Sequence, residues 1–112
     1  MRVVGGKSRG VPLMVPKRGT RPTSDKVREA LFSMINEFIE DSNCLDLFAG
    51  SGSLGIEALS RGADSCVFVD EGKESCSAIS SNLKKTRLEQ GFVKMQRVKS
   101  YVRNCGDSFD VI

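Results

Sequence analysis

The residues with the clearest chemical potential lie in a glycine-rich turn in the first half of the chain. The run Asp46-Leu47-Phe48-Ala49-Gly50-Ser51-Gly52-Ser53-Leu54-Gly55 joins an apolar, strand-like segment to a helix-like one. Glycines at such a junction let the backbone pass close beneath a ligand at the carboxyl edge of a parallel sheet. The spacing of Gly50, Gly52 and Gly55 satisfies G-x-G-x-x-G, which alone is weak evidence for a dinucleotide site. The turn predicts a nucleotide-type ligand without deciding which.

Asp46 narrows the choice of ligand. It lies four residues before Gly50, where a carboxylate would repel the pyrophosphate of a dinucleotide unless it were screened or turned away. S-adenosylmethionine instead carries a sulfonium and an ammonium against a single carboxylate, so an acid at this position attracts it. The turn therefore favours S-adenosylmethionine as the cofactor.

A second acid, Asp70, ends the next apolar run, eighteen positions after Gly52. A carboxylate at this place can accept hydrogen bonds from both hydroxyls of a ribose. Asp70 suits any nucleoside-containing cofactor and does not discriminate between them. The simpler alternative is a strand-end cap that faces water, and Glu71 beside it is interpreted as exposed.

A sheet must position these residues, and the chain alternates accordingly. The predicted elements are strands over residues 44–49, 65–70, 92–98 and from 109, and helices over residues 54–61 and 73–88, with a short helix or turn up to Cys105. This order predicts an α/β fold, a Rossmann-like sheet of parallel strands with helices on both faces. Because the last strand has no turn or helix after it, we expect this chain to be truncated.

An amphipathic helix is predicted before the first strand. Its apolar stripe comprises Val27, Ala30, Leu31, Met34, Ile35, Phe38 and Ile39. Thr23 or Ser24 can cap its first turn, and Asp25 suits the positive end of its dipole. We place a domain boundary here, with a basic hairpin and loop segment over residues 1–22 and an incomplete cofactor-binding domain over residues 23–112.

The positive charge is concentrated at the N-terminal end. Residues 1–28 hold eight bases and one acid, a net charge of +7, whereas the remaining nine bases and thirteen acids give −4. Such a segment is the electrostatic footprint of a protein that binds a polyanion. A solvated basic tail is the alternative.

Composition excludes several other classes of protein. No run approaches the roughly 18 apolar residues of a membrane span, so we expect a cytoplasmic protein. The four cysteines form no CxxC pair and no histidine is present, so we expect no bound metal. Cys44 and Cys66 are interpreted as small buried hydrophobes.

At these residues the sequence resembles the bacterial class I S-adenosylmethionine-dependent methyltransferases that modify the exocyclic N2 of a guanine in small-subunit (16S) ribosomal RNA. Two blocks carry the likeness: residues 21–32, which begin Arg-Pro-Thr-Ser-Asp-Lys, and residues 45–62 around the glycine-rich turn. Weaker likeness at residues 5–10, 67–70, 82–83 and 109–112 extends it over the chain. The chain would then be about the first two thirds of a typical member.

The resemblance implies roles for individual residues. The cofactor would be held by Asp46, Phe48, Ala49, Gly50 and Gly52 at its methionine end, by Asp70 at the ribose, and by Thr23 within the closing segment 21–23. RNA would contact Lys7, Arg9 and Arg21, so 16S ribosomal RNA or a small ribosomal subunit is the implied partner. Arg28 and Glu29 also match the family, although an exposed helix-surface pair is a sufficient interpretation.

The resemblance also marks what this chain lacks. The family's catalytic tetrad, an Asp or Asn followed by two prolines and an aromatic residue, would follow Ile112 directly. In the family mechanism the tetrad accepts hydrogen bonds from the guanine amine and stacks on the extruded base. No catalytic residue is therefore expected within these 112 residues, which should be inactive alone. Arg97 stands where relatives often place an acid or amide against the adenine.

Three other functions stay open. An amino-methyltransferase acting on DNA or another RNA would share every feature above. A nicotinamide- or flavin-binding Rossmann domain is disfavoured by Asp46 and by the Arg-Pro-Thr block. A non-catalytic RNA-binding module that uses residues 1–28 predicts RNA affinity that Asp46→Ala does not change.

Overall fold

The computed structural model describes residues 1–16 and 23–112, and its centre is a sheet of three parallel strands. The strands are β1 (Asn43–Leu47), β2 (Ser65–Asp70) and β3 (Gly91–Met95), in the order β1-β2-β3. The register pairs Cys44 with Cys66, and Cys66 with Gly91. All three strands therefore end at one edge of the sheet, as the alternating sequence predicts.

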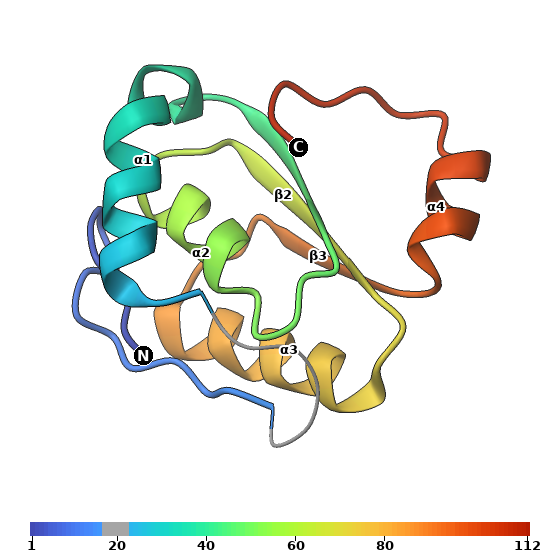
Figure 1. Ribbon diagram of the computed structural model, residues 1–112, viewed down its shortest axis with the longest axis horizontal. Helices are drawn as coiled ribbons and strands as arrows, with labels where there is room; N and C mark the ends of the chain where they lie inside the picture. The colour runs from blue at the N-terminus through green and yellow to red at the C-terminus, as the bar shows by residue number, and fades with distance from the viewer. Residues whose placement is uncertain (17–22) are drawn as a thin grey trace.

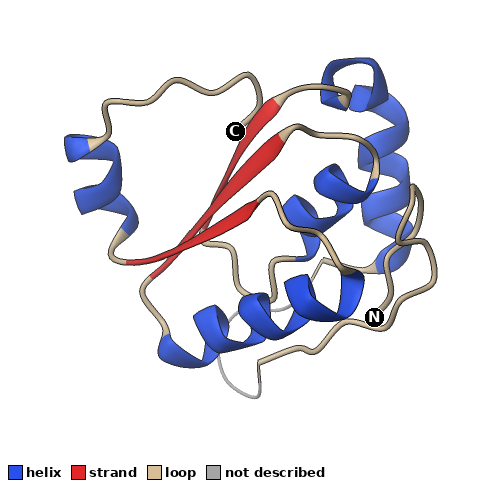
Figure 2. Cartoon of the chain, turned by 180° about the vertical axis from the view of Figure 1, so that it is seen from behind, coloured by secondary structure: helices blue, strands red, loops and turns tan. Residues whose placement is uncertain are grey.

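Helices cover both faces of this sheet (Figures 1 and 2). Their bounds are α1 (Asp25–Ile39), α2 (Ser53–Ser60), α3 (Lys73–Thr86) and α4 (Val98–Asn104). The larger apolar cluster joins α1, α2 and α3 to one face, and the smaller one, with Tyr101 of α4, lies on the other. The predicted α/β class with helices on both faces is confirmed, and the solved structures compared below support it.

The predicted elements are present, with small shifts at their ends. The second strand occupies the predicted residues, whereas the third ends at Met95 and the following residues turn into α4. The Ser24 hydroxyl accepts a hydrogen bond from the Val27 amide, at 3.2 Å, and so caps α1. Ser24, of the two capping candidates, therefore begins the first helix.

The buried face of α1 differs from the predicted stripe. The stripe's flank of Val27, Leu31, Met34 and Phe38 is exposed. Core contact is made instead by Arg28, Phe32 and Ile39, which are buried, with Ile35 packed against the core. These positions follow i, i+4, i+7 and i+11, so they share one side of the helix. The helix was predicted correctly, but the side predicted to face the core was wrong. The observed core-facing side is displaced by about one residue.

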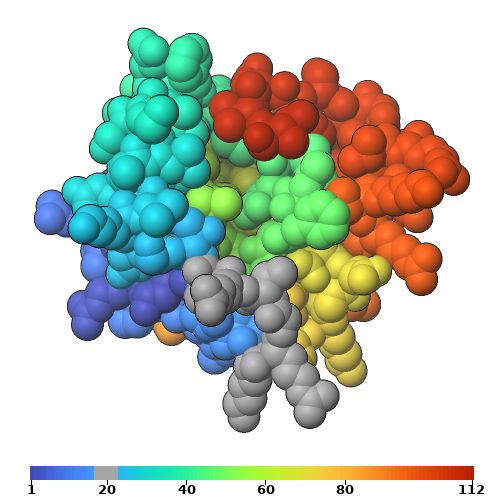
Figure 3. Space-filling view, viewed as in Figure 1, coloured from blue at the N-terminus to red at the C-terminus, as the bar shows by residue number. Residues whose placement is uncertain are grey.

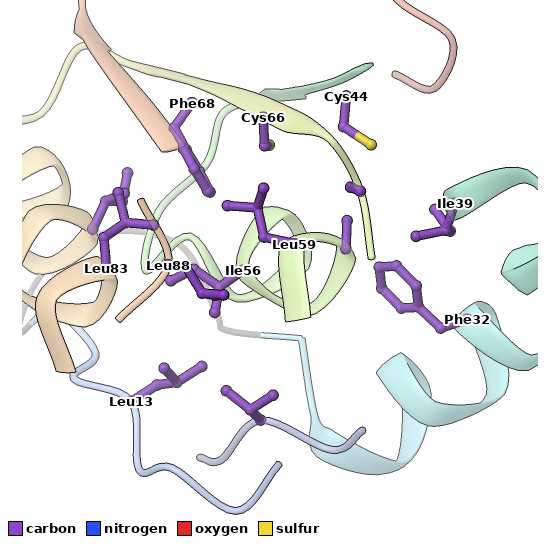
Figure 4. Close-up of a cluster of buried hydrophobic side chains, with 14 residues drawn as sticks. Leu13, Phe32, Ile39, Cys44, Ile56, Leu59, Cys66, Phe68, Leu83 and Leu88 are labelled. Carbon is purple, nitrogen blue, oxygen red and sulfur yellow. The ribbon is translucent and has the colours of Figure 1, made fainter. Parts of the chain in front are cut away.

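Helix α2 is enclosed on two sides, and every residue but Leu54 is buried. Figure 4 shows Ile56 and Leu59 between the sheet side chains Cys66 and Phe68 and, opposite them, Leu13 of the N-terminal segment. Cys44 and Cys66 are buried here, as interpreted, and burial raises the pKa of both thiols. The N-terminal segment thus forms an outer layer over α2.

The N-terminal segment is a small hairpin, as its glycines and prolines predict. An antiparallel bridge joins Arg2 to Pro12, and the Val3 amide donates to the Val11 carbonyl at 3.0 Å. Its turn lies over residues 7–10, directly after Gly6, which has a φ of +79°. The proposed boundary at residue 22 falls in a stretch outside the described residues and stays a prediction.

The predicted fourth strand reaches the sheet at one residue. Val111 forms a parallel bridge with Cys44, and the Leu45 amide donates to the Val111 carbonyl at 2.8 Å. Because β2 occupies the other edge of β1, Val111 extends the sheet on the free side. In the ranges 1–16 and 23–112, no helix has the length and apolarity needed to cross a membrane.

Candidate functional site

The turn between β1 and α2 is shaped by three residues in the left-handed region. Phe48, Gly50 and Gly52 have φ values of 56°, 59° and 79°. Gly50 and Gly52 adopt this conformation at little cost, whereas Phe48 adopts it against its side chain's preference. The Phe48 side chain is 73% exposed, so the turn presents an aromatic ring at its surface.

The second and third glycines of the pattern serve close packing. A Cβ on Gly52 would lie 3.0 Å from Ile79, and one on Gly55 would lie 2.3 Å from the Phe68 ring. Gly55 therefore lets α2 begin directly against the sheet, the role of the last glycine in such turns.

The Asp46 carboxylate contacts the end of this turn that leads into α2. Its carboxylate accepts a hydrogen bond from the Gly55 amide at 3.1 Å. Burial, assisted by the negative charge of Asp70, raises the pKa of Asp46 to about 7, although the Gly55 hydrogen bond opposes the rise. Near neutral pH the group therefore exchanges between its neutral and charged forms.

The Asp70 carboxylate contacts the same turn closer to its start, at Gly50. One carboxylate oxygen accepts from the Gly50 amide at 3.0 Å, and the other accepts from the Gly72 amide at 2.8 Å. Asp70 thus joins the β1–α2 turn to the β2–α3 turn. An ionised carboxylate has about four acceptor positions, so each oxygen can accept a further hydrogen bond.

Two cavities are lined by predicted site residues. A cleft of about 630 Å³ is lined by Phe48, Asp70, Arg97 and the first residues of α3. Asp46 lines a separate recess of about 300 Å³ between α1, β1 and Ile112. Figure 3 shows this recess between the atoms of α1 and the last residues of the chain. Ala49, Gly50 and Gly52 form the turn between the two acids.

The remaining predicted residues lie elsewhere. The Thr23 carbonyl accepts from Arg28 Nε at 3.3 Å, and within the described part of the chain Thr23 makes no hydrogen bond to either acid. Lys7 and Arg9 are exposed on the hairpin turn. Arg21 lies outside the described residues. The RNA contacts expected of these bases stay predictions.

Arg28 is not the exposed helix-surface residue that its pairing with Glu29 suggested. It is fully buried and pairs with Asp25 and with Glu57 of α2, the latter at 3.1 Å. Its position in line with Phe32 is the signal that was missed, because a charged residue on the core-facing side of a helix requires a buried partner.

Glu57 and Asn82 are the other residues that sequence reasoning missed. Glu57 accepts hydrogen bonds from the Val4 and Gly5 amides at 2.9 and 2.8 Å, and pairs with Arg61 at 2.8 Å. Asn82 of α3 bonds to both backbone groups of Met14 and donates to the Ser51 carbonyl at 3.0 Å. These side chains fasten the hairpin to α2, α3 and the glycine-rich turn. Both residues lie in stretches that carry the family likeness, and each is a polar residue among apolar helical positions.

The fold and the site together define the class of protein to which this chain belongs. A solved Escherichia coli structure, yhhF, with a provisional methyltransferase assignment, is 38% identical and has a TM-score of 0.87 over 97% of this chain and 60% of its own. A Thermus thermophilus protein of unassigned function has the same TM-score at 33% identity, over 97% of this chain and 64% of its own. The fold is that of the class I methyltransferases.

The family follows from the whole length of the chain. The family model described as "Conserved hypothetical protein 95" matches residues 1–112, and the chain belongs to this family. Escherichia coli ribosomal RNA small subunit methyltransferase D is 36% identical over 100% of this chain, and Bacillus subtilis YlbH, provisionally named an rRNA methyltransferase, is 49% identical over 79%. The chain spans 57% and 48% of these two relatives. The resemblance carried by the two sequence blocks is confirmed.

Proposed function

We propose that this chain is the donor-binding part of an RNA methyltransferase that transfers a methyl group from S-adenosylmethionine to the exocyclic N2 of a guanine in 16S ribosomal RNA. The observation that carries the proposal is the pair of carboxylates, Asp46 and Asp70, bonded to the two ends of one glycine-rich turn. Membership of a family with curated ribosomal RNA methyltransferases supports the substrate class.

The residues present fit S-adenosylmethionine, which supplies an electrophilic methyl group when bound. Asp70 keeps acceptor capacity for the ribose hydroxyls beside a cleft of about 630 Å³. Asp46 offers a negative charge to the ammonium and sulfonium groups. The exposed Phe48 ring lines the cleft and gives apolar contact. Ala49, Gly50 and Gly52 bring the backbone close to the ligand.

The contribution of this chain to the reaction is positioning. Both acids are held in place by backbone amides, and fixed geometry is a large part of what an enzyme supplies to a two-substrate transfer. Hydrogen bonding to the guanine amine is left to the tetrad expected after Ile112. We therefore expect donor binding but no turnover from these 112 residues alone.

The proposed partner is 16S ribosomal RNA, either free or within a small ribosomal subunit or its assembly intermediate. This partner places the protein in the cytoplasm, where ribosomal RNA is modified. Lys7, Arg9 and Arg21 are proposed to contact the RNA, and Thr23 the cofactor.

Calorimetric titration of S-adenosylmethionine into this chain tests the donor site. We expect binding that Asp46→Asn weakens at least tenfold, because the amide keeps an acceptor for the Gly55 amide but loses the charge. NAD is the control ligand, and a cooperative melt of the variant shows that it is folded. Binding of NAD in place of S-adenosylmethionine would support the dinucleotide alternative.

Methylation by the complete protein tests the substrate. Nucleoside mass spectrometry after incubation with unmodified 16S RNA or small subunits should show N2-methylguanosine. Methylation of adenine or of DNA instead would support the related amino-methyltransferases, and RNA affinity without any methylation would support a non-catalytic RNA-binding module.

A further inference from the structure

The turn of the hairpin meets the last turn of α3, and the contact brings together bases that are far apart in the sequence. The Ser8 hydroxyl donates to the Thr86 carbonyl at 2.9 Å, across a separation of 78 residues. The same turn is held to the end of α2, because the Ser8 amide donates to the Ser60 hydroxyl at 2.9 Å. Figures 1 and 2 both show the end of α3 beside the N-terminal segment.

Basic residues flank both sides of this contact. Neighbouring Cα atoms are about 3.8 Å apart, so Lys7 and Arg9 on either side of Ser8 must lie close to the bases around Thr86. Those bases are Lys84, Lys85 and Arg87. All five side chains are exposed, and within residues 1–16 and 23–112 none of them forms an ion pair. Glu89, also exposed, is the nearest acid in the sequence.

The contact between the two basic groups is held firmly. Ser8, Ser60 and Thr86 are buried, and Asn82, one turn before Thr86, binds the hairpin strand at Met14. The backbone segments that carry the five bases therefore keep one arrangement relative to each other. The positive ends of Lys84 and Lys85 also suit the negative end of the α3 dipole, but that effect does not account for Lys7 and Arg9 at the same place.

We propose that Lys7, Arg9, Lys84, Lys85 and Arg87 form one surface, the hairpin–α3 basic surface, that binds RNA phosphates away from the methylated base. The proposal rests on the proposed function and adds α3 to the RNA-binding part of the molecule. Asp70 lies at the other end of α3 beside Gly72. A helix of 14 residues is about 21 Å long, so the surface lies too far from the cofactor cleft to touch a base held there.

Such a surface recognises the RNA backbone and not its sequence. Phosphate contacts by Lys and Arg release counterions and add affinity that falls with salt. They also fix the register of an RNA on the protein, so that one base reaches the cleft. The hairpin–α3 basic surface would thus raise the affinity for RNA without entering the chemical step.

The test uses the complete protein and an RNA fragment of 16S that contains the methylated guanine. The variant Lys85→Gln/Arg87→Gln removes two charges of the surface and keeps an unbranched polar side chain at each position. The matched control is Lys94→Gln/Arg103→Gln, which removes one exposed lysine and one exposed arginine from β3 and α4. RNA affinity is measured at several salt concentrations, together with kcat, KM and affinity for S-adenosylmethionine.

We expect the surface variant to bind RNA about tenfold more weakly, with a salt slope shallower by about 1.4 to 1.8. KM for RNA should rise, whereas kcat and donor affinity should match those of the control. Equal losses in both variants, or no loss in either, would overturn the proposal. If the surface variant binds small ribosomal subunits more weakly but binds free RNA normally, the surface contacts a ribosomal protein and not RNA. That result would also overturn the proposal. Absence of methylation by the unaltered protein would instead count against the proposed function.

Discussion

Asp46 has two opposed requirements. The role proposed for Asp46 needs its negative charge for a cationic donor, yet burial raises its pKa to about 7 from an ordinary value of 3.8. The folded chain therefore holds the Asp46 proton more tightly than the unfolded chain does. The contribution of Asp46 to the free energy of unfolding falls as the pH rises from about 3.8 to 7. The site gives up some stability at neutral pH for a charge that the donor can use.

Donor binding should therefore depend on pH. A cationic ligand prefers the ionised form, so affinity for S-adenosylmethionine should rise as the pH increases towards 7 and level off above about 8, by at most about tenfold per unit. Calorimetry between pH 5.5 and 8.5, in buffers of different ionisation enthalpy, should also detect proton release. Asp46→Asn should abolish the dependence. A flat profile in the unaltered chain would show that Asp46 is already ionised before binding.

Arg28 and Glu57 form the other buried charged group, and it is structural. Glu57 is fully buried and accepts hydrogen bonds from Arg28 of α1, from Arg61 directly after α2, and from the hairpin backbone. Removing one member leaves the other charge partly unpaired in a place that water does not reach, and that loss is larger than the net value of the pair.

We expect Arg28→Met to lower the free energy of unfolding by about 3 kcal/mol. The methionine keeps much of the side-chain volume, so the loss reports the charge. Urea denaturation measures it, with exposed Lys26→Met on the same helix as a control that should change stability by less than about 0.5 kcal/mol. Similar small changes in both variants would mean that Glu57 is neutralised by its other partners.

Among the elements, α1 is the one that presents apolar residues on two sides. Phe32 and Ile39 are buried in the core cluster, whereas Met34 and Phe38 are 77% and 61% exposed. Leu31 lies between the two sides and lines the recess shared with Asp46 and Ile112. A continuous apolar face of this kind promotes association.

The isolated chain should self-associate through this face. Met34→Gln/Phe38→Gln should shift it towards monomer at micromolar concentration, because the variant removes the two most exposed apolar side chains of α1. Light scattering coupled to size exclusion measures the change, and Glu37→Gln on the same helix is the control. An unaltered chain that is monomeric at the same concentration would contradict this prediction.

At the scale of the molecule, the chain is built in layers around α2. The sheet lies on one side of this helix and the hairpin on the other, so α2 is buried. It begins directly after the glycine-rich turn. Glu57 and Asn82 fasten the hairpin to that core. The described part of the hairpin is therefore packed against the core, and the backbone that carries Lys7 and Arg9 has a fixed position relative to the glycine-rich turn.

The sequence alone determined the order of the elements, the α/β class, the glycine-rich turn and the two acids at strand ends, because these depend on local spacing. Local spacing shows that a helix has a buried face but not what covers it. The inward side of α1, the partners of Arg28, Glu57 and Asn82, and the meeting of Ser8 with Thr86 were decided by the tertiary structure. The hydrogen bonds from Arg28 to Glu57, from Met14 to Asn82 and from Ser8 to Thr86 join residues 29 to 78 positions apart, and no short-range pattern in the chain records such a contact.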